Sequence, residues 1–424
     1  MLLRVAISNF LSFYDRTTFD MFPNPKRIGF KNHIYDMAVP LLKMGVLYGA
    51  NNAGKSNFVK AIQFLRNFVV KDNYITPHTF ESFRFKLSDD QQIPISISIE
   101  FYFKEQYYIY SLELDKNIHE VLQISGLGSK NDELVFERDG NKLKSDYVFS
   151  GEIVKDLLRK NPYSSILALN NKFPVLKSRD VDNAYNWFKN YLLVIGINSD
   201  VDDLIKMMEA NQPLLDFSNK MMQSLGISDS LSIRKMEFDE WLNTSRAQTF
   251  QGLPELSQNN AELVAKRNRR NEFHLTVKDG KRMVSEFMFK QHGPTGKTVD
   301  MDIDTQSDGT VRLLTLLPAF FGAMKEEKVV LIDEIENSMH PNMIYQLVKH
   351  YAQNSSNGQL IFTTHLTRFQ NQQELLRVDE LWMVNKLHGM TCLKSFNDFK
   401  IHNTINVENG YVEGRFGGVP LITL

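Results

Sequence analysis

The chain has 424 residues, of which 42% are hydrophobic, 23% charged and 11% aromatic, so it can form a large core in one composite domain or two closely joined ones. Its formal net charge of −1 excludes a fold that binds nucleic acid through overall positive charge, and leaves room only for a local patch. The single cysteine, Cys392, excludes an internal disulfide framework and a cysteine zinc site. We find neither a long uncharged apolar run nor a signal-peptide core, and therefore expect a soluble protein of the cytoplasm.

The first clear pattern lies at the N-terminus. Leu2–Phe10 and Phe13–Phe19 alternate apolar and polar residues around a bend at Asn9–Phe13, which predicts two strands. This opening resembles the N-terminal strand pair of ABC-type ATPases of the RecF and SMC kind. The resemblance implies that the pair packs over the base of a nucleotide.

A glycine-bounded loop follows. Its sequence, Gly49-x-x-x-x-Gly54-Lys55-Ser56, has the spacing of a P-loop, whose backbone N–H groups surround a β-phosphate. Lys55 would reach the β- and γ-phosphates, and the Ser56 hydroxyl would bind magnesium. The residues that we assign to ATP binding here are Gly49, Asn51, Asn52, Gly54, Lys55, Ser56 and Asn57.

The surroundings of the loop support this assignment. Met44–Tyr48 has the pattern of a buried strand, and Asn57–Val70 has apolar residues at helical spacing. The alternative, a glycine turn without a ligand, would leave the acidic and histidine motifs further along the chain unexplained. Gly293–Thr298 repeats some of the same letters, but its glycines are too close together, so we interpret it as a hairpin turn.

Residues 80 to 140 are rich in strand patterns. Ile93–Phe103, Tyr107–Leu114 and Leu134–Arg138 alternate apolar and polar residues and predict an antiparallel sheet. In ABC-type heads such a sheet stands beside the nucleotide, and a glutamine in the loops leading into it senses the γ-phosphate. Gln91 and Gln92 are the candidates for that glutamine, and two solvated loop residues are the simpler interpretation.

From about Gly151 to Arg270 the pattern predicts amphipathic helices without a heptad or a repeat, and hence a short insertion that faces a partner. The run at 266–270, Lys-Arg-Asn-Arg-Arg, carries four positive charges in five residues. It is either a solvated helix face or a patch for a phosphate backbone or an acidic protein. Strands at Phe273–Val277 and Arg282–Phe289 then flank a hairpin turn.

Gln306–Thr310 precedes a helical pattern over Val311–Met324. Ser307 would cap this helix. The second interpretation is the ABC signature, Ser-x-Gly at a helix N-terminus, in which Ser307 and Gly309 contact the γ-phosphate bound by a neighbouring protomer. The leading leucine of the usual signature is missing.

Val329–Ile332 is an apolar strand pattern that ends in Asp333 and Glu334. Because strand alternation points the two side chains differently, Asp333 would hold magnesium together with Ser56, and Glu334 would polarise the attacking water. Two carboxylates at the end of a buried strand are costly without a cation. We interpret the pair as a Walker B element.

A further apolar strand pattern, Gln359–Thr364, ends at His365. ABC-type ATPases carry a switch histidine at this distance from the acidic pair, which implies that His365 contacts the γ-phosphate. Glu336–Pro341 is similar to the segment that crosses the dimer interface of those proteins, and Pro341 suits the first turn of the next helix.

Together, Gly49–Asn57, Ser307–Gly309, Leu331–Pro341 and Thr363–His365 resemble the ABC-like AAA ATPases of bacterial abortive-infection and restriction-linked systems. The similarity is to the RloA and AbiLi type, with AriA of the PARIS system and the OLD proteins as relatives, and it extends to the glycine-rich tail. Unlike the OLD proteins, the chain has no Asp-x-Asp motif in the 59 residues after His365, so we do not expect it to cut nucleic acid itself. The resemblance implies a separately encoded effector, often a nuclease.

The sequence thus predicts an α/β ABC-type P-loop ATPase head with an antiparallel side sheet and a helical insertion. We expect residues 1–150 to form the N-terminal half of the head, 151–270 the insertion and 271–424 the C-terminal half. The head would dimerise around ATP and Mg²⁺, hydrolyse ATP slowly and use the ATP state as the switch of a two-component anti-phage system. A phage protein or a nucleic acid would be the trigger, and no membrane contact is expected.

Two other functions stay open on the sequence alone. A RecF-like repair protein would bind DNA, and the near-neutral charge argues against it. A scaffold that binds ATP without hydrolysing it has no need of a carboxylate at Glu334, so that residue argues against this second alternative.

Overall fold

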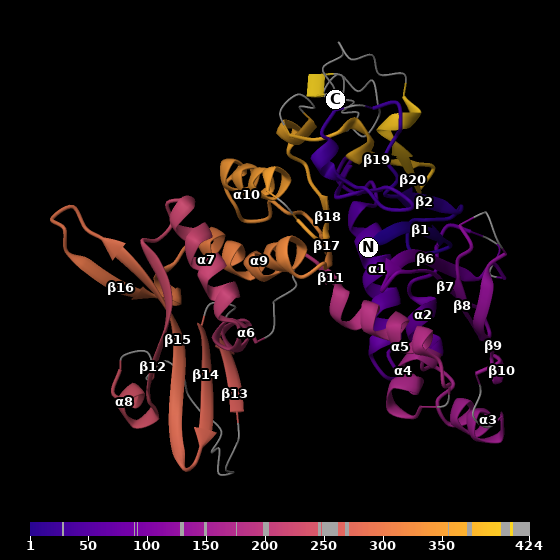
Figure 1. Ribbon diagram of the computed structural model, residues 1–424, viewed down its shortest axis with the longest axis horizontal. Coiled ribbons are helices and arrows are strands. Elements are labelled where there is room, and N and C mark those ends of the chain that lie inside the picture. The colour runs from indigo at the N-terminus through magenta and orange to yellow at the C-terminus, as the bar shows by residue number, and fades with distance from the viewer. Residues whose placement is uncertain are drawn as a thin grey trace. The chain divides into compact units, whose positions relative to one another are not determined.

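The computed structural model describes residues 1–424 except 28, 89, 91, 128–130, 148–150, 175, 198–202, 245–246, 248–261, 268–270, 355, 371–374, 400–407 and 410–424. The chain divides into two compact units, whose elements are labelled in Figure 1. The first unit contains residues 1–197, 322–336 and 348–424, and the second contains residues 198–321 and 337–347.

The first unit contains an antiparallel sheet with the strand order β10-β9-β8-β7-β6-β1-β2. Strand β6 alternates buried and half-buried residues along its whole length because only one of its faces packs on the core. The strands of this sheet are β1 (Leu2–Ser8), β2 (Thr17–Asp20), β6 (Ile95–Phe103), β7 (Gln106–Leu114), β8 (Ile118–Ile124), β9 (Glu133–Asp139) and β10 (Lys142–Lys144).

A second sheet in this unit has the order β11-β17-β18-β5-β19-β20, in which only β20 runs antiparallel to its neighbour. Its central strands are buried and apolar, as parallel strands covered on both faces require. The strands are β5 (Met44–Tyr48), β11 (Leu192–Ile195), β17 (Val329–Ile332), β18 (Gln359–Thr363), β19 (Leu381–Leu387) and β20 (Met390–Ser395), and a small separate pair is β3 (Ile34–Tyr35) with β4 (Leu41–Leu42).

One hydrophobic core joins the two sheets of the first unit. The ring of Phe19 on β2 lies 5.1 Å from that of Phe58 on α1 and 4.9 Å from that of Trp382 on β19. Phe101 of β6 stacks on Trp187 with ring centroids 4.1 Å apart. The helices of this unit are α1 (Lys55–Val70), α2 (Pro77–Glu81), α3 (Gly151–Lys160), α4 (Ile166–Lys172) and α5 (Arg179–Asn186).

The second unit has its own sheet, in the order β12-β15-β14-β13 with β16 paired to β15. Its core includes the buried side chains of Trp241, Phe273 and Val284. The elements are α6 (Leu204–Ala210), α7 (Gln212–Ser224), β12 (Ser230–Glu237), α8 (Phe238–Leu242), β13 (Glu262–Arg267), β14 (Asn271–Lys278), β15 (Lys281–His292) and β16 (Thr298–Asp302), while α9 (Asp308–Lys325) and α10 (Pro341–Gln353) each have residues in both units.

The predicted α/β fold with an antiparallel side sheet is confirmed. The N-terminal strands pair antiparallel, the P-loop lies between β5 and α1, and Gly293–Thr298 is the hairpin turn between β15 and β16. The prediction of a helical insertion from 151 to 270 is wrong for its second part, because 230–237 and 262–267 are strands in the sheet of the second unit. The contacts also separate the chain near 197 rather than near 150.

The described part of the basic run at 266–270 is not a helix face. Lys266 and Arg267 belong to β13, and residues 268–270 lie outside the described residues. Among the described helices, none combines the length and the apolar character that crossing a membrane requires.

Candidate nucleotide-binding site

The P-loop begins where β5 ends and leads directly into α1. Its two glycines are required by close contacts. A Cβ on Gly49 would lie 2.3 Å from the carbonyl oxygen of Val384, and a Cβ on Gly54 would lie 2.0 Å from the hydroxyl of Thr391. Gly54 also has a φ of 115°, which side-chain-bearing residues rarely adopt. The exposed loop residue Asn52 has a φ of 64°, in the left-handed region that asparagine tolerates.

The ammonium group of Lys55 folds back over the loop. It donates to the carbonyl oxygens of Gly49 at 2.7 Å and Ala50 at 3.1 Å. Burial lowers the pKa of Lys55, and the carboxylates of Glu334 and Asp333 oppose that shift. Because the ammonium group has lost part of its hydration, a bound anion such as a phosphate would stabilise its charge.

Hydroxyl groups from two distant segments hold the loop in place. Asn57 Nδ2 donates to Ser12 Oγ at 2.7 Å, and Ser12 Oγ lies 2.6 Å from Thr391 Oγ1. Thr391 Oγ1 in turn donates to the Ala53 carbonyl at 2.8 Å. The bend after β1, the P-loop and β20 are thereby joined in one buried network, which the sequence analysis did not foresee.

The carboxylates of Asp333 and Glu334 follow β17 as predicted, and Thr363 fixes the turn that carries them. The Thr363 hydroxyl donates to Asp333 Oδ1 at 2.7 Å and accepts from the backbone N–H of Glu334 at 2.7 Å. Glu334 has a φ of 45°, an unusual backbone state for a glutamate, which these bonds help to hold. Thr363 is completely buried at the end of β18 and was not predicted as a site residue.

His365 lies next to this turn. Its Nε2 is 3.9 Å from Glu334 Oε1, and its backbone N–H donates to Glu336 Oε1 at 2.6 Å. Burial and the nearby Lys55 ammonium lower the pKa of His365 from 6.5, against the opposite effect of the carboxylates. The ring is therefore neutral near pH 7, able to donate from one nitrogen and accept at the other.

These groups meet because β17, β18 and β5 are parallel and in register. Ile332 pairs with Phe362, and Thr363 pairs with Leu47, so the carboxyl ends of the three strands share one edge of the sheet. Within the first unit, that edge carries Lys55, Asp333, Glu334 and His365. Carboxyl edges of parallel sheets are where α/β proteins bind ligands.

The chemistry of the donors fits Mg²⁺. Ser56 and Asp333 offer hard oxygen atoms, which Mg²⁺ prefers, and it usually takes its remaining ligands from phosphates and water. In the described contacts Asp333 uses only Oδ1, toward Thr363, which leaves Oδ2 for a metal or its water. No cluster of three or more His, Cys, Asp or Glu side chains suited to a metal occurs in the part of the chain that the structure describes.

The expected signature residues, Ser307 and Gly309, belong to the second unit, whereas the P-loop, the acidic pair and His365 belong to the first. Ser307 Oγ accepts from the backbone N–H of Thr310 at 3.2 Å, so the capping role is present. A Cβ on Gly309 would lie 2.9 Å from the Ser338 carbonyl oxygen, which shows how closely the start of α9 approaches the segment after Walker B. Their contact with a nucleotide of another protomer stays a prediction.

The candidates for a γ-phosphate-sensing glutamine gain no support. Gln91 lies outside the described residues, and Gln92 is exposed, with its backbone N–H bound to Asp90 Oδ1 at 2.8 Å.

Comparison with protein families gives one match that spans most of the chain. Residues 45–369 match the family described as "AAA domain, putative AbiEii toxin, Type IV TA system". The chain belongs to this AAA family. The matched range begins on the P-loop strand and ends just after His365, so it includes the P-loop, Asp333, Glu334, Thr363 and His365 but not Ser12 or Thr391.

Individual relatives are more distant. A Helicobacter pylori (strain ATCC 700392 / 26695) protein named ATP/GTP phosphatase is 24% identical over 397 residues, covering 90% of this chain and 94% of its own. The SMC head domain from Thermotoga maritima covers 93% of this chain and 98% of its own at 11% identity and a TM-score of 0.41. The match to an SMC head bound to the C-winged helix domain of ScpA covers 93% of this chain and 96% of that structure, at 12% identity and a TM-score of 0.45.

Proposed function

We propose that this AAA-family chain binds ATP with Mg²⁺ and hydrolyses it. The observation that carries the proposal is the meeting of Lys55, the Asp333–Glu334 turn and His365 at one edge of one sheet. The family and the name of the Helicobacter relative point in the same direction.

Each side chain has a definable task in this reaction. Lys55 would leave the loop carbonyls to neutralise the β- and γ-phosphates, while Ser56 and Asp333 hold Mg²⁺, which supplies charge neutralisation when bound. Glu334 would accept a hydrogen bond from the attacking water and orient it toward the γ-phosphorus. Neutral His365 would donate to the γ-phosphate while Glu334 stays ionised beside it.

We further propose that ATP is sandwiched between two copies, with Ser307 and Gly309 of one copy at the γ-phosphate held by the other. The position of Ser307 and Gly309 at the N-terminal end of α9 supports this, because helix N-termini attract phosphate. The biological role that we propose is the sensor and regulator of an anti-phage system with a separate effector, which the AbiEii-related family description favours.

The test measures ATP turnover and particle mass together, for the parent and for Glu334→Gln. We expect the substitution to lower kcat by about a hundredfold to ten-thousandfold, the usual range for loss of a general base. It should also make an ATP-bound dimer or larger assembly accumulate. Glu113→Gln, on the exposed face of β7, is the matched control and should behave as the parent.

Two results would count against the proposal. Turnover by Glu334→Gln at the parent rate would remove the catalytic assignment. Turnover without any ATP-dependent change of mass would restrict Ser307 to its capping role.

A further inference from the structure

A pocket of about 700 Å³ lies in the first unit, in the loop between β2 and β4. This loop enters the sheet at the amino end of β5, whereas the P-loop leaves at the carboxyl end. The two features are thus separated by the length of β5, roughly 17 Å for five residues. The pocket does not belong to the nucleotide site.

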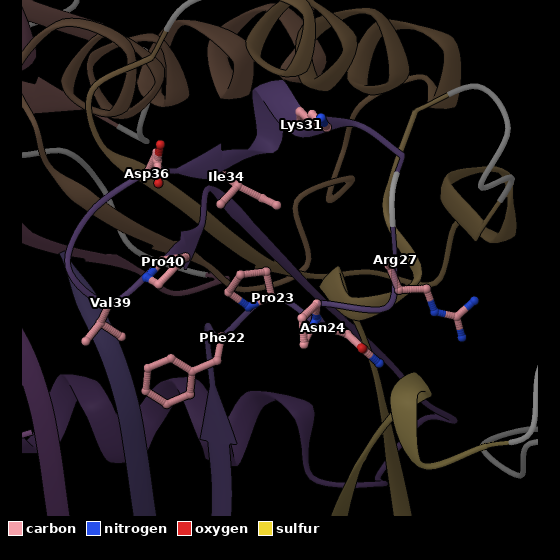
Figure 2. A pocket seen from close by; sticks show the side chains of 10 residues that line it. Phe22, Pro23, Asn24, Arg27, Lys31, Ile34, Asp36, Val39 and Pro40 are labelled. Atoms are coloured by element: carbon pink, nitrogen blue, oxygen red, sulfur yellow. The ribbon is translucent and has the colours of Figure 1, made fainter. Parts of the chain in front are cut away.

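The pocket is lined mainly by rigid apolar groups. Its apolar lining residues are Phe22, Pro23, Pro25, Ile34, Val39 and Pro40. In Figure 2 Pro23 and Ile34 lie near the middle of the hollow. Because each proline fixes its own φ, much of this surface keeps its shape in the absence of a ligand.

Charged side chains surround this hollow. In Figure 2 Lys31, Arg27 and Asp36 lie at its periphery, and Arg27 extends away from the apolar residues. In the described part of the chain, neither Arg27 nor Lys31 makes an ion pair or a side-chain hydrogen bond. Lys26 adds a third cation to the same loop, in which Lys26 and Lys31 are exposed and Arg27 is half-buried, against the single carboxylate of Asp36.

A buried ionic cluster holds the backbone of the loop from behind. Arg377 pairs with Asp379 at 2.7 Å and donates to the backbone carbonyls of Arg27, at 3.2 Å, and Gly29. The same carboxylate oxygen, Asp379 Oδ2, also accepts a hydrogen bond from the backbone N–H of Asn24 at 2.7 Å. The pocket is therefore preorganised, which reduces the ordering cost of binding a partner.

We propose that this pocket binds an acidic peptide segment of a protein partner, with an apolar side chain in the hollow and carboxylates beside Arg27 and Lys31. An apolar centre with a charged rim is the usual anatomy of a protein interface. Arg27 points beyond the hollow (Figure 2), so the rim suits a ligand longer than the pocket. A nucleic acid would meet the cations but would leave the apolar centre unused.

The inference is independent of ATP hydrolysis and can be tested on the intact chain. The probe is a random-peptide library displayed on phage and selected on immobilised full-length protein. We expect the enriched peptides to carry Asp or Glu around a bulky apolar residue. Synthetic versions are then titrated by fluorescence anisotropy at low and high salt.

Variants on the rim and in the hollow locate the binding site. Binding should weaken at least about tenfold for the double variant Arg27→Glu/Lys31→Glu and for Val39→Asp, and should weaken with salt. Lys26→Glu lies in the same loop but outside the lining, and should stay within about twofold of the parent. Thermal melting of each variant shows whether it is folded. If Val39→Asp does not fold, the charge-reversal double variant still tests the binding site.

Several outcomes would overturn the inference. These are no enrichment over a surface without protein, enriched peptides that lack acidic residues, or equal binding by the parent and the folded rim variant. Displacement of the peptides by ATP would place their site at the P-loop instead.

Discussion

The two ends of β5 and β19 carry the same kinds of charged residues, but these are buried in ion pairs at one end and incompletely paired at the other. At the amino end, Arg377 pairs with Asp379 at 2.7 Å and His33 with Glu380 at 3.0 Å, and all four side chains are buried. At the carboxyl end, the hydrogen bonds that the Lys55 ammonium makes to described residues all go to backbone carbonyls, and the side chains of His365 and Glu334 are partly exposed and 3.9 Å apart.

This difference separates a structural cluster from a binding site. Charges that neutralise each other inside the protein have no need of a ligand, whereas charges held close without full pairing do. Burial raises the pKa of Glu380 while His33 opposes the shift, so this cluster satisfies itself. The comparison predicts that substitutions at the amino end change stability and those at the carboxyl end change nucleotide chemistry.

The largest effect should come from Arg377→Met. It leaves the Asp379 carboxylate buried without a counter-charge, which typically costs about 3–5 kcal/mol of the free energy of unfolding. Urea unfolding of parent and variant measures this loss, and the ATP affinity of the folded variant should match the parent. A variant with parental stability would show that the cluster does not hold the fold.

The counterpart at the carboxyl end is Lys55→Met. Loss of charged hydrogen bonds to two phosphates should lower ATP affinity by at least roughly a hundredfold, since each such bond contributes about 1.5–3 kcal/mol. Calorimetric titration with ATP and Mg²⁺ measures this. Urea unfolding should show no loss of stability, because the substitution removes the buried charge of Lys55 and with it the free energy spent on desolvating that charge. Equal losses of stability at both ends would contradict the comparison.

A smaller effect is expected for Thr363→Val, which keeps the shape of the side chain and removes its hydroxyl. The Asp333 carboxylate and the Glu334 N–H then lose a buried partner, at about 1–3 kcal/mol. We expect a lower kcat and a higher Mg²⁺ requirement. Thr363→Ser should restore both. Failure of the serine to rescue would mean that packing, not the hydroxyl, is responsible.

The smallest effect concerns pH. Because the pKa of His365 is lowered from 6.5, the folded protein takes up this proton later than the unfolded chain as the pH falls. The histidine therefore costs stability only below about pH 6.5, and the acid limb of the ATPase rate should also begin below that value. His365→Asn should lose this limb. An inflection of the parent's pH–rate curve above pH 6.5 would mean that the pKa of His365 is raised rather than lowered, which would contradict the proposed environment.

Much of the site follows from short stretches of sequence. The spacing of Gly49, Gly54 and Lys55 and the acids after β17 are local patterns, and the histidine after β18 is recognisable by its distance from those acids. Thr363, Ser12 and Thr391 could not, because a hydroxyl at the end of a strand carries no signal until the pairing of β5, β18 and β19 is known.

The fold shows the same limit. The antiparallel sheet was predictable because β6 alternates over all nine of its residues and β7 alternates from Tyr108 to Leu114. Strand β12 was assigned to the helical segment because exposed polar residues interrupt its alternation. Its side chains at 234, 235 and 237 are exposed, and its pairing with β15 decides its structure.

The contact between Thr391 and the P-loop also bears on how the protein is made. The two partners of this hydrogen bond, Thr391 and Ala53, are separated by 338 positions. During synthesis from the N-terminus, Gly49–Ser56 leaves the ribosome long before β18 and β19, the strands that flank β5, and before the threonine that closes on Gly54. Contacts of such long range form late and slowly. A nascent or C-terminally shortened chain would thus carry the phosphate-binding sequence without its binding shape, and nucleotide binding would begin only once the chain is nearly complete.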